Sequence, residues 1–317
     1  MQIFQNVPLR DKNWFGTGGP AKFFCEPEND QAFVTAIKFA QNNKLQIFVL
    51  GEGANTLISD EGFDGLVIRP QLKEVTIDDS LITAGAGITI ENLINFCLDN
   101  NLVGLEEFSG IPGTLGGSVF INIHYFEFLL SKYLLKAKVV SRSREILEVD
   151  NGWFEFGYNT SKLHLNNHFL INATLKLKKS TDMEAAYAKG RRDEIIRHRY
   201  RRYPISKTCG SFFRNFKDEE IQFESDNKKI LNVAYYFDKL GIKGKLRVGN
   251  ASVSPLHANM LVNNGDAKSS DIINIAKTMQ IMVYKNFKIL PIPECRLIGF
   301  KKSPLYTDNS IPNAYAE

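Results

Sequence analysis

The stretch "GIPGTLGGSVFINIHYFEFLLSKYL", residues 110–134, changes character halfway along its length. Its first part places four glycines between positions 110 and 117, and the next glycine is Gly152. Glycines at this density let several backbone N–H groups converge on one anion, because glycine takes positive φ and brings the main chain close to a ligand. The second part is bulky, aromatic and apolar. The stretch therefore predicts an anion-binding loop that runs into an apolar segment.

Two further glycine clusters precede this loop, "LGEGANTLISD" at 50–60 and "AGAG" at 84–87. Each stands at the end of a strand-like segment or before a helix-like one, where a phosphate-binding nest is expected. None of the three matches the dinucleotide fingerprint G-x-G-x-x-G, and none contains the G-K-[ST] of a Walker loop. A single cluster of this kind is most often an ordinary turn. Three in one half of the chain favour a large phosphate-containing ligand.

The composition indicates a soluble globular protein. The chain has 317 residues, enough for two or three domains, with 44% apolar and 23% charged residues. A net charge of +4 does not demand a nucleic-acid partner. The four scattered cysteines form no C-x-x-C, which favours free thiols in a reducing compartment. With neither a secretory leader nor an apolar run of about 18 residues, we expect a cytoplasmic protein.

Helix-like and strand-like segments alternate along the chain. The helix at 30–43 is expected to begin with Asp30 as its N-cap, and a charged helix at 181–204, ended by Pro204, is interpreted as the connection between domains. The other expected helices span 89–101, 232–244 and 268–287. Strands, in several cases with the turns that follow them, are expected at 45–55, 65–70, 74–87, 136–150, 168–179, 250–267 and 289–300, those at 136–150 and 168–179 in an antiparallel or mixed sheet.

Few single residues in the sequence indicate a catalytic or binding role by themselves. Ser211 in "TCGSFFRNF" is not in a G-x-S-x-G elbow, and a lone serine or a lone Glu294 in "PIPECRLIGF" is usually structural. His164 and His168 lack a third ligand nearby, so we predict no metal site. Six arginines between 191 and 202 raise the alternative of a nucleic-acid-binding helix. Acidic residues interrupt them and no stacking platform is evident, which favours a solvated helix face.

Taken in order, these pieces resemble the UDP-N-acetylenolpyruvylglucosamine reductase (MurB) family of flavoenzymes. The resemblance covers the chain from about residue 10 to residue 300, and the "HANMLVNNG" segment and the chain length are more similar to the shorter type II members. It rests on "WFGTGGPAKFFCEP" (14–27), "LGEGANTLISD", "AGAG", "SGIPGTLGGSVFIN" (109–122), "FGYNTSKL" (156–163), "GSFFRN" (210–215), "GIKGKLRVGNASVSPLHANMLVNNG" (241–265) and "PECRLIG" (293–299).

The resemblance implies an α+β fold with an FAD-binding domain of the PCMH/vanillyl-alcohol-oxidase type, made of two subdomains, followed by a C-terminal α+β substrate domain. The bounds we expect are 1–70 and 71–203 for the two FAD-binding subdomains, the latter with the helical connector, then 204–302 for the substrate domain and 303–317 for a tail. The implied activity is NADPH-dependent reduction of UDP-N-acetylglucosamine enolpyruvate to UDP-N-acetylmuramate, in peptidoglycan precursor synthesis. That activity implies roles in cell wall biogenesis, cell shape and cell division. We expect a monomer with no nucleic-acid or membrane partner.

By resemblance, Ser211 is the proton donor and Glu294 is a second acid or polarising group beside the substrate. A serine hydroxyl can protonate a carbanion-like centre when nearby cations stabilise the alkoxide. The resemblance implies substrate contacts from Tyr158, Arg202, Arg214, Asn215 and Lys243. It implies FAD contacts from Gly51, Glu52, Gly53, Ala54, Asn55, Thr56, Gly85, Gly87, Gly110, Ile111, Pro112, Gly113, Thr114, Gly116, Gly117, Ser118 and Asn122.

The chain departs from the family pattern in two places. Asn159 stands where the family's Y-R-x-S places an arginine, so that either Arg296 or Arg214 substitutes, or the reaction is slow, or the substrate differs. Residues 123–128 replace a glycine-containing loop by large side chains, which are expected to pack aside into a rebuilt segment or to narrow the cofactor cleft. These departures leave one alternative function, a divergent FAD-binding paralogue with another substrate or little reductase activity.

Overall fold

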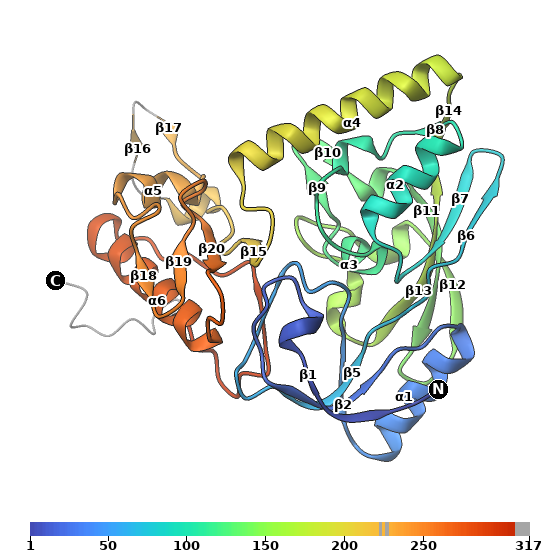
Figure 1. The fold of residues 1–317 in the computed structure, drawn as a ribbon, viewed down its shortest axis with the longest axis horizontal. Helices are drawn as coiled ribbons and strands as arrows, with labels where there is room; N and C mark the ends of the chain where they lie inside the picture. Colours follow the sequence, from blue (N-terminus) through green and yellow to red (C-terminus); the bar gives the residue numbers. More distant parts are fainter. Residues whose placement is uncertain (222–223, 226–227, 308–317) are drawn as a thin grey trace. The chain divides into compact units, whose positions relative to one another are not determined.

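The computed structural model describes residues 1–221, 224–225 and 228–307, and the chain divides into two compact units (Figure 1). The first unit contains Met1–Asn6, Lys22–Glu52 and Asp64–Arg199; the second contains Val7–Ala21, Gly53–Phe63 and Tyr200–Glu317. The chain thus passes from the first unit to the second three times: between Asn6 and Val7, between Glu52 and Gly53 inside the "LGEGAN" segment, and inside the charged helix. The sequence did not predict that two N-terminal segments join the second unit. The division of residues 1–203 into two subdomains stays a prediction.

A four-stranded sheet and one helix form the first layer of the first unit. The strand order is β1-β2-β5-β3, and β3 and β5 run parallel. Helix α1 buries Phe33, Ala36, Ile37 and Ala40 on one face. These elements are β1 (Phe4–Pro8), β2 (Pro20–Cys25), α1 (Asp30–Asn42), β3 (Gln46–Val49) and β5 (Phe63–Ile68).

The N-cap of α1 was predicted one residue too late. Asn29, in an extended conformation, accepts a hydrogen bond from the N–H of Ala32 and is the cap. Asparagine and aspartate are both good N-caps, so the sequence alone left two adjacent candidates. Asp30 lies in the first turn, where its carboxylate faces Lys138 at 3.1 Å.

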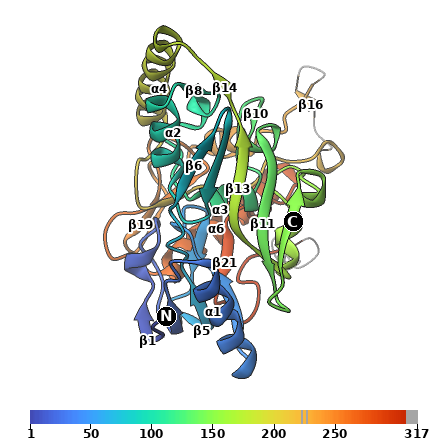
Figure 2. The same ribbon diagram turned by 90° about the vertical axis from the view of Figure 1, so that its right-hand side faces the viewer.

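A five-stranded antiparallel sheet is the second layer of the first unit, with its long strands side by side in Figure 2. The strand order is β12-β11-β13-β7-β6. A sheet, either antiparallel or mixed, was predicted from 136–150 and 168–179, and all of its strand pairs are antiparallel. The strands and the two helices that pack in the same apolar core are β6 (Val75–Asp78), β7 (Leu81–Gly85), α2 (Ile90–Asp99), α3 (Leu115–Phe120), β11 (Leu134–Ser141), β12 (Ile146–Asp150) and β13 (His168–Lys176).

The charged helix α4 spans Asp182–Arg202 and ends before Pro204, as predicted. Only Ala185, Ala188 and Ile195 are buried along it, so most of its surface is solvated. Part of its positive charge is matched within the first unit, where Arg191 pairs with Glu107 at 3.1 Å. No helix in the described part of the chain is both long and apolar enough to cross a bilayer.

The second unit packs helices against a small antiparallel sheet of order β15-β20-β19-β18. A separate parallel pair joins β21 to β4, the strand that directly follows the "LGEGAN" segment. The predicted strand at 289–300 thus shortens to three residues. The elements are η1 (Arg10–Lys12), β4 (Thr56–Ile58), β15 (Thr208–Ser211), α5 (Val233–Lys239), β18 (Arg247–Val248), β19 (Ala251–Val253), β20 (Met260–Asn263), α6 (Ser269–Phe287) and β21 (Arg296–Ile298).

Short elements complete the described chain. Three two-residue ladders are β8 (Leu102–Val103) with β14 (Lys178–Lys179), β9 (His124–Tyr125) with β10 (Phe128–Leu129), and β16 (Glu224–Ser225) with β17 (Lys228–Lys229). The remaining 3-10 turns are η2 (Glu106–Phe108), η3 (Leu130–Lys132), η4 (Gly152–Phe154), η5 (Lys162–Leu165) and η6 (Asp218–Glu220).

Substituting two glycines of the first unit by alanine tests how much of its glycine content serves packing. A Cβ at Gly85 would overlap the carbonyl oxygen of Leu72, whereas a Cβ at Gly190, inside α4, meets nothing within 4 Å. Gly85→Ala is expected to lower the free energy of unfolding by about 1–3 kcal/mol, the usual cost of overpacking. Gly190→Ala is expected to raise it by about 0.5–1 kcal/mol, because alanine is the better helix former. Denaturant unfolding of both variants measures the two changes, and a Gly85→Ala protein as stable as the parent would contradict the packing role.

Candidate functional site

The three glycine clusters come together within the first unit. A Cβ at Gly51 would lie 2.6 Å from Thr114 Oγ1, and the N–H of Gly113 donates to Glu52 Oε2 at 2.9 Å. The N–H of Gly116 donates to the carbonyl of Ala86 at 2.9 Å. Segments 51–52, 84–87 and 110–117 are therefore neighbours in space. Of the residues predicted to contact FAD, Gly53, Ala54, Asn55 and Thr56 belong to the second unit.

Glycine is required in these clusters for two different reasons, close packing and backbone conformation. A Cβ at Gly85 or Gly87 would overlap a backbone carbonyl of the 70–72 segment, so close packing alone requires glycine there. Gly113 has open space at its Cβ position but a φ of +139°, so its backbone conformation requires glycine. Contacts of these residues with FAD stay predictions.

Around the 109–117 loop the polar groups suit an anionic dinucleotide. The amide of Gly113 already holds a carboxylate, that of Glu52. The guanidinium of Arg199 donates to the carbonyl of Gly110 at 3.2 Å and brings positive charge to the loop. Ser109 is fully buried, and its hydroxyl has no hydrogen-bond partner among the described residues.

Other predicted cofactor residues near the loop have internal partners. Thr114 accepts a hydrogen bond from the N–H of Gly117 and caps α3, while Ser118 is buried within that helix. Asn122 is 4% exposed, donates to the carbonyl of Gly157 and accepts from the N–H of Ser131, both at 3.2 Å. The side chain of Asn122 thus anchors the turn that follows Gly157. Ile111 and Pro112 continue the glycine loop, and Ile111 packs against the core.

The turn at 157–160 carries two predicted substrate-side residues. The N–H of Gly157 donates to the carbonyl of Thr160 at 3.1 Å, and Asn159 has a φ of +54°, a conformation that asparagine tolerates well. The amide nitrogen Nδ2 of Asn159 is shielded from solvent and finds no partner among the described residues. Tyr158 is 60% exposed, and its ring lies 5.0 Å from that of His124.

Residues 123–128 form a hairpin in place of the family's glycine loop. Tyr125 pairs with Phe128 across the β9–β10 ladder, and Phe126 lies at the tip, 69% exposed. The guanidinium of Arg199 lies 5.4 Å from the centre of the Tyr125 ring. The segment is thus a hairpin, and whether its large side chains pack aside or narrow the cofactor cleft stays a prediction.

In the second unit, Ser211 and Glu294 are brought together through one backbone carbonyl. Ser211 ends β15, and the next residue, Phe212, accepts a hydrogen bond from the N–H of Glu294 at 2.8 Å. Cys209 and Cys295 flank the pair and are buried. Burial, together with a hydrogen-bond contact to the Cys209 thiol, raises the pKa of Cys295 well above its ordinary value, so this thiol is protonated and a poor nucleophile.

Arg214 and Asn215 follow Ser211 but have partners within the second unit. Arg214 holds Glu220 through both guanidinium ends, at 2.8 and 2.5 Å, and this hydrogen bonding lowers the pKa of Glu220. Asn215 Oδ1 accepts from the N–H of Val233 at the start of α5, at 3.2 Å. The positive charge of Arg214 is therefore already balanced by a carboxylate.

The predicted substrate residues Arg202 and Lys243 share one charged cluster with a histidine that the sequence did not single out. Lys243 pairs with Asp238 at 3.3 Å, and the ring of His257 lies 5.5 Å from that of Tyr203. Burial lowers the pKa of His257; the Asp238 charge opposes the shift, and Arg202 and Lys243 add to it. His257 opens the "HANMLVNNG" segment, but no local pattern indicated its charged surroundings, because Arg202, Asp238 and Lys243 stand in other segments of the chain.

Two family models match the two parts of the chain. One, described as "FAD binding domain", matches residues 21–150, and the other, described as "UDP-N-acetylenolpyruvoylglucosamine reductase, C-terminal domain", matches residues 201–298. With the converging glycine clusters, the first match defines the class: an α+β flavoprotein with an FAD-binding domain of the PCMH type.

Similar proteins narrow the class to a family. The UDP-N-acetylenolpyruvoylglucosamine reductase of Clostridium tetani (strain Massachusetts / E88) is 31% identical over 299 residues, covering 94% of this chain and 92% of that protein. The protein of the same name from Synechococcus sp. (strain JA-3-3Ab) is 30% identical, with coverages of 96% and 94%. The crystal structure of UDP-N-acetylenolpyruvylglucosamine reductase (MurB) from Thermus caldophilus has a TM-score of 0.75 at 26% identity, with coverages of 94% and 98%. The chain belongs to the UDP-N-acetylenolpyruvoylglucosamine reductase family.

Protonation of His257 is expected to make the fold less stable in acid. The folded protein holds His257 with a lowered pKa, while in the unfolded chain its pKa is about 6.5. Below about pH 6.5 the unfolded chain therefore binds more protons, and the free energy of unfolding falls as the pH drops toward the lower folded pKa. Denaturant titrations at pH 7.5, 6.0 and 5.0 are expected to show a smaller loss for His257→Gln than for the parent. Equal losses of unfolding free energy in the two proteins would contradict the role of His257. Burial also lowers the pKa values of His124 and His168, but both proteins contain these residues, so their contribution is the same in each.

Proposed function

We propose that this chain reduces UDP-N-acetylglucosamine enolpyruvate to UDP-N-acetylmuramate with bound FAD and with NADPH as hydride donor. Family membership supports the reaction class, and the single observation that carries the assignment of residues is the hydrogen bond from Glu294 N–H to Phe212 O at 2.8 Å. This bond sets the candidate proton donor, Ser211, beside the candidate acid. The product belongs to peptidoglycan precursor synthesis, which gives the protein a place in cell wall biogenesis, cell shape and division. We further propose a cytoplasmic monomer.

The reaction adds a hydride to the terminal carbon of the enolpyruvyl double bond and a proton to the carbon that bears the ether oxygen and the carboxylate. FAD, when bound, supplies the hydride that it has accepted from NADPH. The Ser211 hydroxyl supplies the proton, and Glu294 polarises the substrate on the same side. A hydroxyl is a weak acid, so the step depends on nearby cations that stabilise the alkoxide as it forms.

Two regions of the first unit are proposed to hold the cofactor and the reacting end of the substrate. The 109–117 loop, with Arg199 beside it, suits the FAD diphosphate, because a guanidinium binds anions. Nδ2 of Asn159 is a hydrogen-bond donor without an acceptor among the described residues, and we propose that it donates to the substrate carboxylate. Asparagine supplies a hydrogen bond here but no charge.

Arg202, Lys243 and His257 are proposed to hold the UDP part of the substrate. The cluster combines two cations with a histidine that burial keeps neutral near pH 7. Asp238 balances one of the charges before the substrate arrives, through its ion pair with Lys243. A diphosphate competes well for such cations, because it carries more charge than one carboxylate.

The Ser211→Ala variant tests the proposed reaction. The parent, after incubation with FAD, is expected to show the visible absorbance of a bound flavin and to oxidise NADPH only when UDP-N-acetylglucosamine enolpyruvate is present. Ser211→Ala is expected to keep the flavin and to lose about 10²–10⁴-fold in kcat, the usual worth of a general acid. Ser252→Ala, which truncates a buried serine of the same sheet, serves as the control and is expected to keep its turnover. A parent that stays colourless with FAD contradicts the cofactor assignment, and an active Ser211→Ala contradicts the role of Ser211.

The Asn159→Arg variant tests whether the missing family cation limits the rate. A group placed at a developing anion contributes about 10²–10³-fold to kcat, so restoring the arginine is expected to raise kcat within this range. Thr160→Arg places the same charge one residue away in the same turn and is expected to leave kcat near the parent value. If Asn159→Arg is no faster than the parent, the carboxylate is stabilised by a group other than residue 159.

A further inference from the structure

Asn259 is a buried side chain that behaves like an extra peptide unit of a strand. It stands immediately before β20 and is 3% exposed. Its Nδ2 donates to the carbonyl of Phe213 at 2.7 Å, and its Oδ1 accepts from the N–H of Phe213 at 3.1 Å. Its own backbone carbonyl accepts from the N–H of Phe212 at 2.8 Å. Three hydrogen bonds from one residue therefore hold the two residues that follow Ser211.

The opposite edge of the same segment is held by the loop that carries Glu294. The carbonyl of Phe212 accepts from the N–H groups of Glu294, at 2.8 Å, and Cys295, at 3.2 Å. The N–H of Arg214 donates to the carbonyl of Ile292 at 3.0 Å. Segment 212–214 thus lies between Asn259 and the 292–295 loop, and any shift of this segment moves Ser211 relative to Glu294.

Asn259 also contacts the charged cluster. Its N–H donates to Nδ1 of His257 at 3.3 Å. This hydrogen bond leaves Nε2 of the neutral ring to carry the proton, as a donor toward a ligand. Asn259 therefore contacts both the segment that follows Ser211 and His257.

Only asparagine offers this pattern at this position. The pairing of β15 with β20 is irregular, because its register shifts between Thr208 and Ser211. Where the regular β15–β20 hydrogen bonds stop, the Asn259 carboxamide bonds to Phe213 instead, with a donor and an acceptor spaced like those of a peptide group. Aspartate lacks the donor and sets a carboxylate against the Phe213 carbonyl, and glutamine is longer by one methylene.

We infer that Asn259 is a positioning residue, whose carboxamide fixes Ser211 relative to Glu294. The inference rests on the proposed roles of these two residues. It assigns Asn259 no contact with the substrate and no part in FAD binding. Its loss is expected to slow the protonation step and to leave the reduction of FAD by NADPH unchanged.

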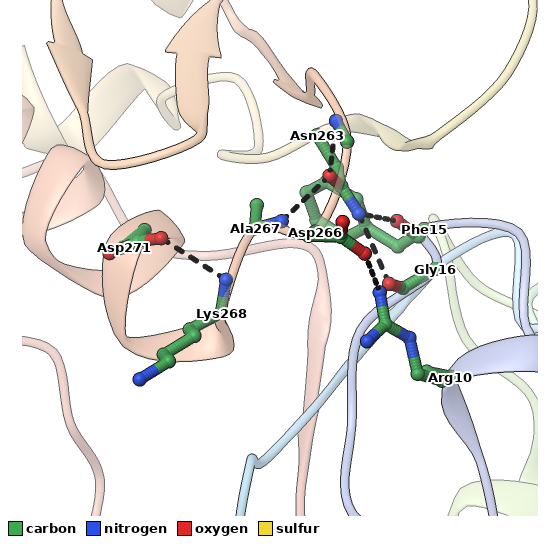
Figure 3. A network of polar contacts seen from close by, with 9 residues as sticks. Arg10, Phe15, Gly16, Asn263, Asp266, Ala267, Lys268 and Asp271 are labelled. Atoms are coloured by element: carbon green, nitrogen blue, oxygen red, sulfur yellow. Dashed lines mark hydrogen bonds and ion pairs between the residues drawn. The ribbon is translucent and has the colours of Figure 1, made fainter.

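The structure offers a matched control on the same strand. Asn263, 5% exposed, donates to the carbonyls of Phe15 and Gly16, both at 3.1 Å, and accepts from the N–H groups of Gly265 and Ala267 (Figure 3). Its side chain thus makes four hydrogen bonds to backbone groups, against two from the side chain of Asn259, and all four go to other segments. Asn263→Ala removes four buried side-chain hydrogen bonds and Asn259→Ala removes two, so a purely structural effect would be at least as large in Asn263→Ala.

The experiment compares Asn259→Ala, Asn259→Asp and Asn263→Ala as FAD-loaded full chains, by rapid kinetics of the two half-reactions and by hydrogen exchange. Misplacing a catalytic group by about 1 Å costs on the order of 10²-fold. Both Asn259 variants are expected to lose about this factor in the oxidation of the reduced protein by UDP-N-acetylglucosamine enolpyruvate, with reduction by NADPH at the parent rate. Amide exchange is expected to rise in peptides covering 211–214 and also in those covering 292–295. Asn263→Ala is expected to leave both segments and both half-reactions close to the parent.

The outcomes separate the inference from the proposed function. If amide exchange at 292–295 is the same in Asn259→Ala as in the parent, the positioning role is wrong. It is also wrong if Asn259→Ala slows both half-reactions and Asn263→Ala slows them by the same factor. If the parent itself fails to turn over the sugar nucleotide, the proposed function is wrong, and the exchange data alone decide whether Asn259 links the two segments. If Ser211→Ala is fully active while Asn259→Ala is slow, Asn259 acts on a different group and the inference is overturned.

Discussion

Direct contact between backbone segments, with no side chain between them, is the constraint on which both units depend. A Cβ at Gly62 would overlap the carbonyl of Pro20, and a Cβ at Gly299 would overlap the carbonyl of Gly62, all within the second unit. Gly85 and Gly87 meet the 70–72 segment of the first unit in the same way. Overlap with a fixed backbone cannot be relieved by a change of rotamer. These glycines therefore fix where neighbouring segments run.

Side-chain amides extend this backbone framework where regular ladders stop. Asn122 ties the 157–160 turn to the end of α3, Asn259 holds the segment after Ser211, and Asn263 holds the loop at Phe15 and Gly16. Each amide can donate and accept at once, so it satisfies buried backbone groups that would otherwise be costly. The residues that make the site are thus held largely by polar contacts to the main chain, which are directional, as well as by the apolar cores.

Much of the fold followed from local pattern. The helices α1, α2, α4 and α6 lie within one or two residues of their expected bounds, because apolar periodicity and end signals are local properties. The strands of the second sheet lie where they were expected, although the segments 74–87 and 136–150 each hold two strands. The pieces of the MurB pattern, in order along the chain, predicted the family. Less could be foreseen where a contact joins distant residues. Arg199 was interpreted as part of a solvated face, yet it donates to Gly110, because a helix face gives no sign of the loop packed beside it.

The sequence by itself determined the class of protein, the family, the order of the elements, and the glycines, serine and glutamate that bear the family's pattern. Only the tertiary structure decided what each of these positions does locally. It separated glycines required by packing, at 85 and 87, from those required by backbone conformation, at 113. It also joined Ser211 to Glu294 through Phe212, and brought His257 beside Arg202 and Lys243. The physical reason is that hydrogen bonds, close contacts and charge–charge interactions act over a few ångströms in space, whatever the separation of the residues along the chain.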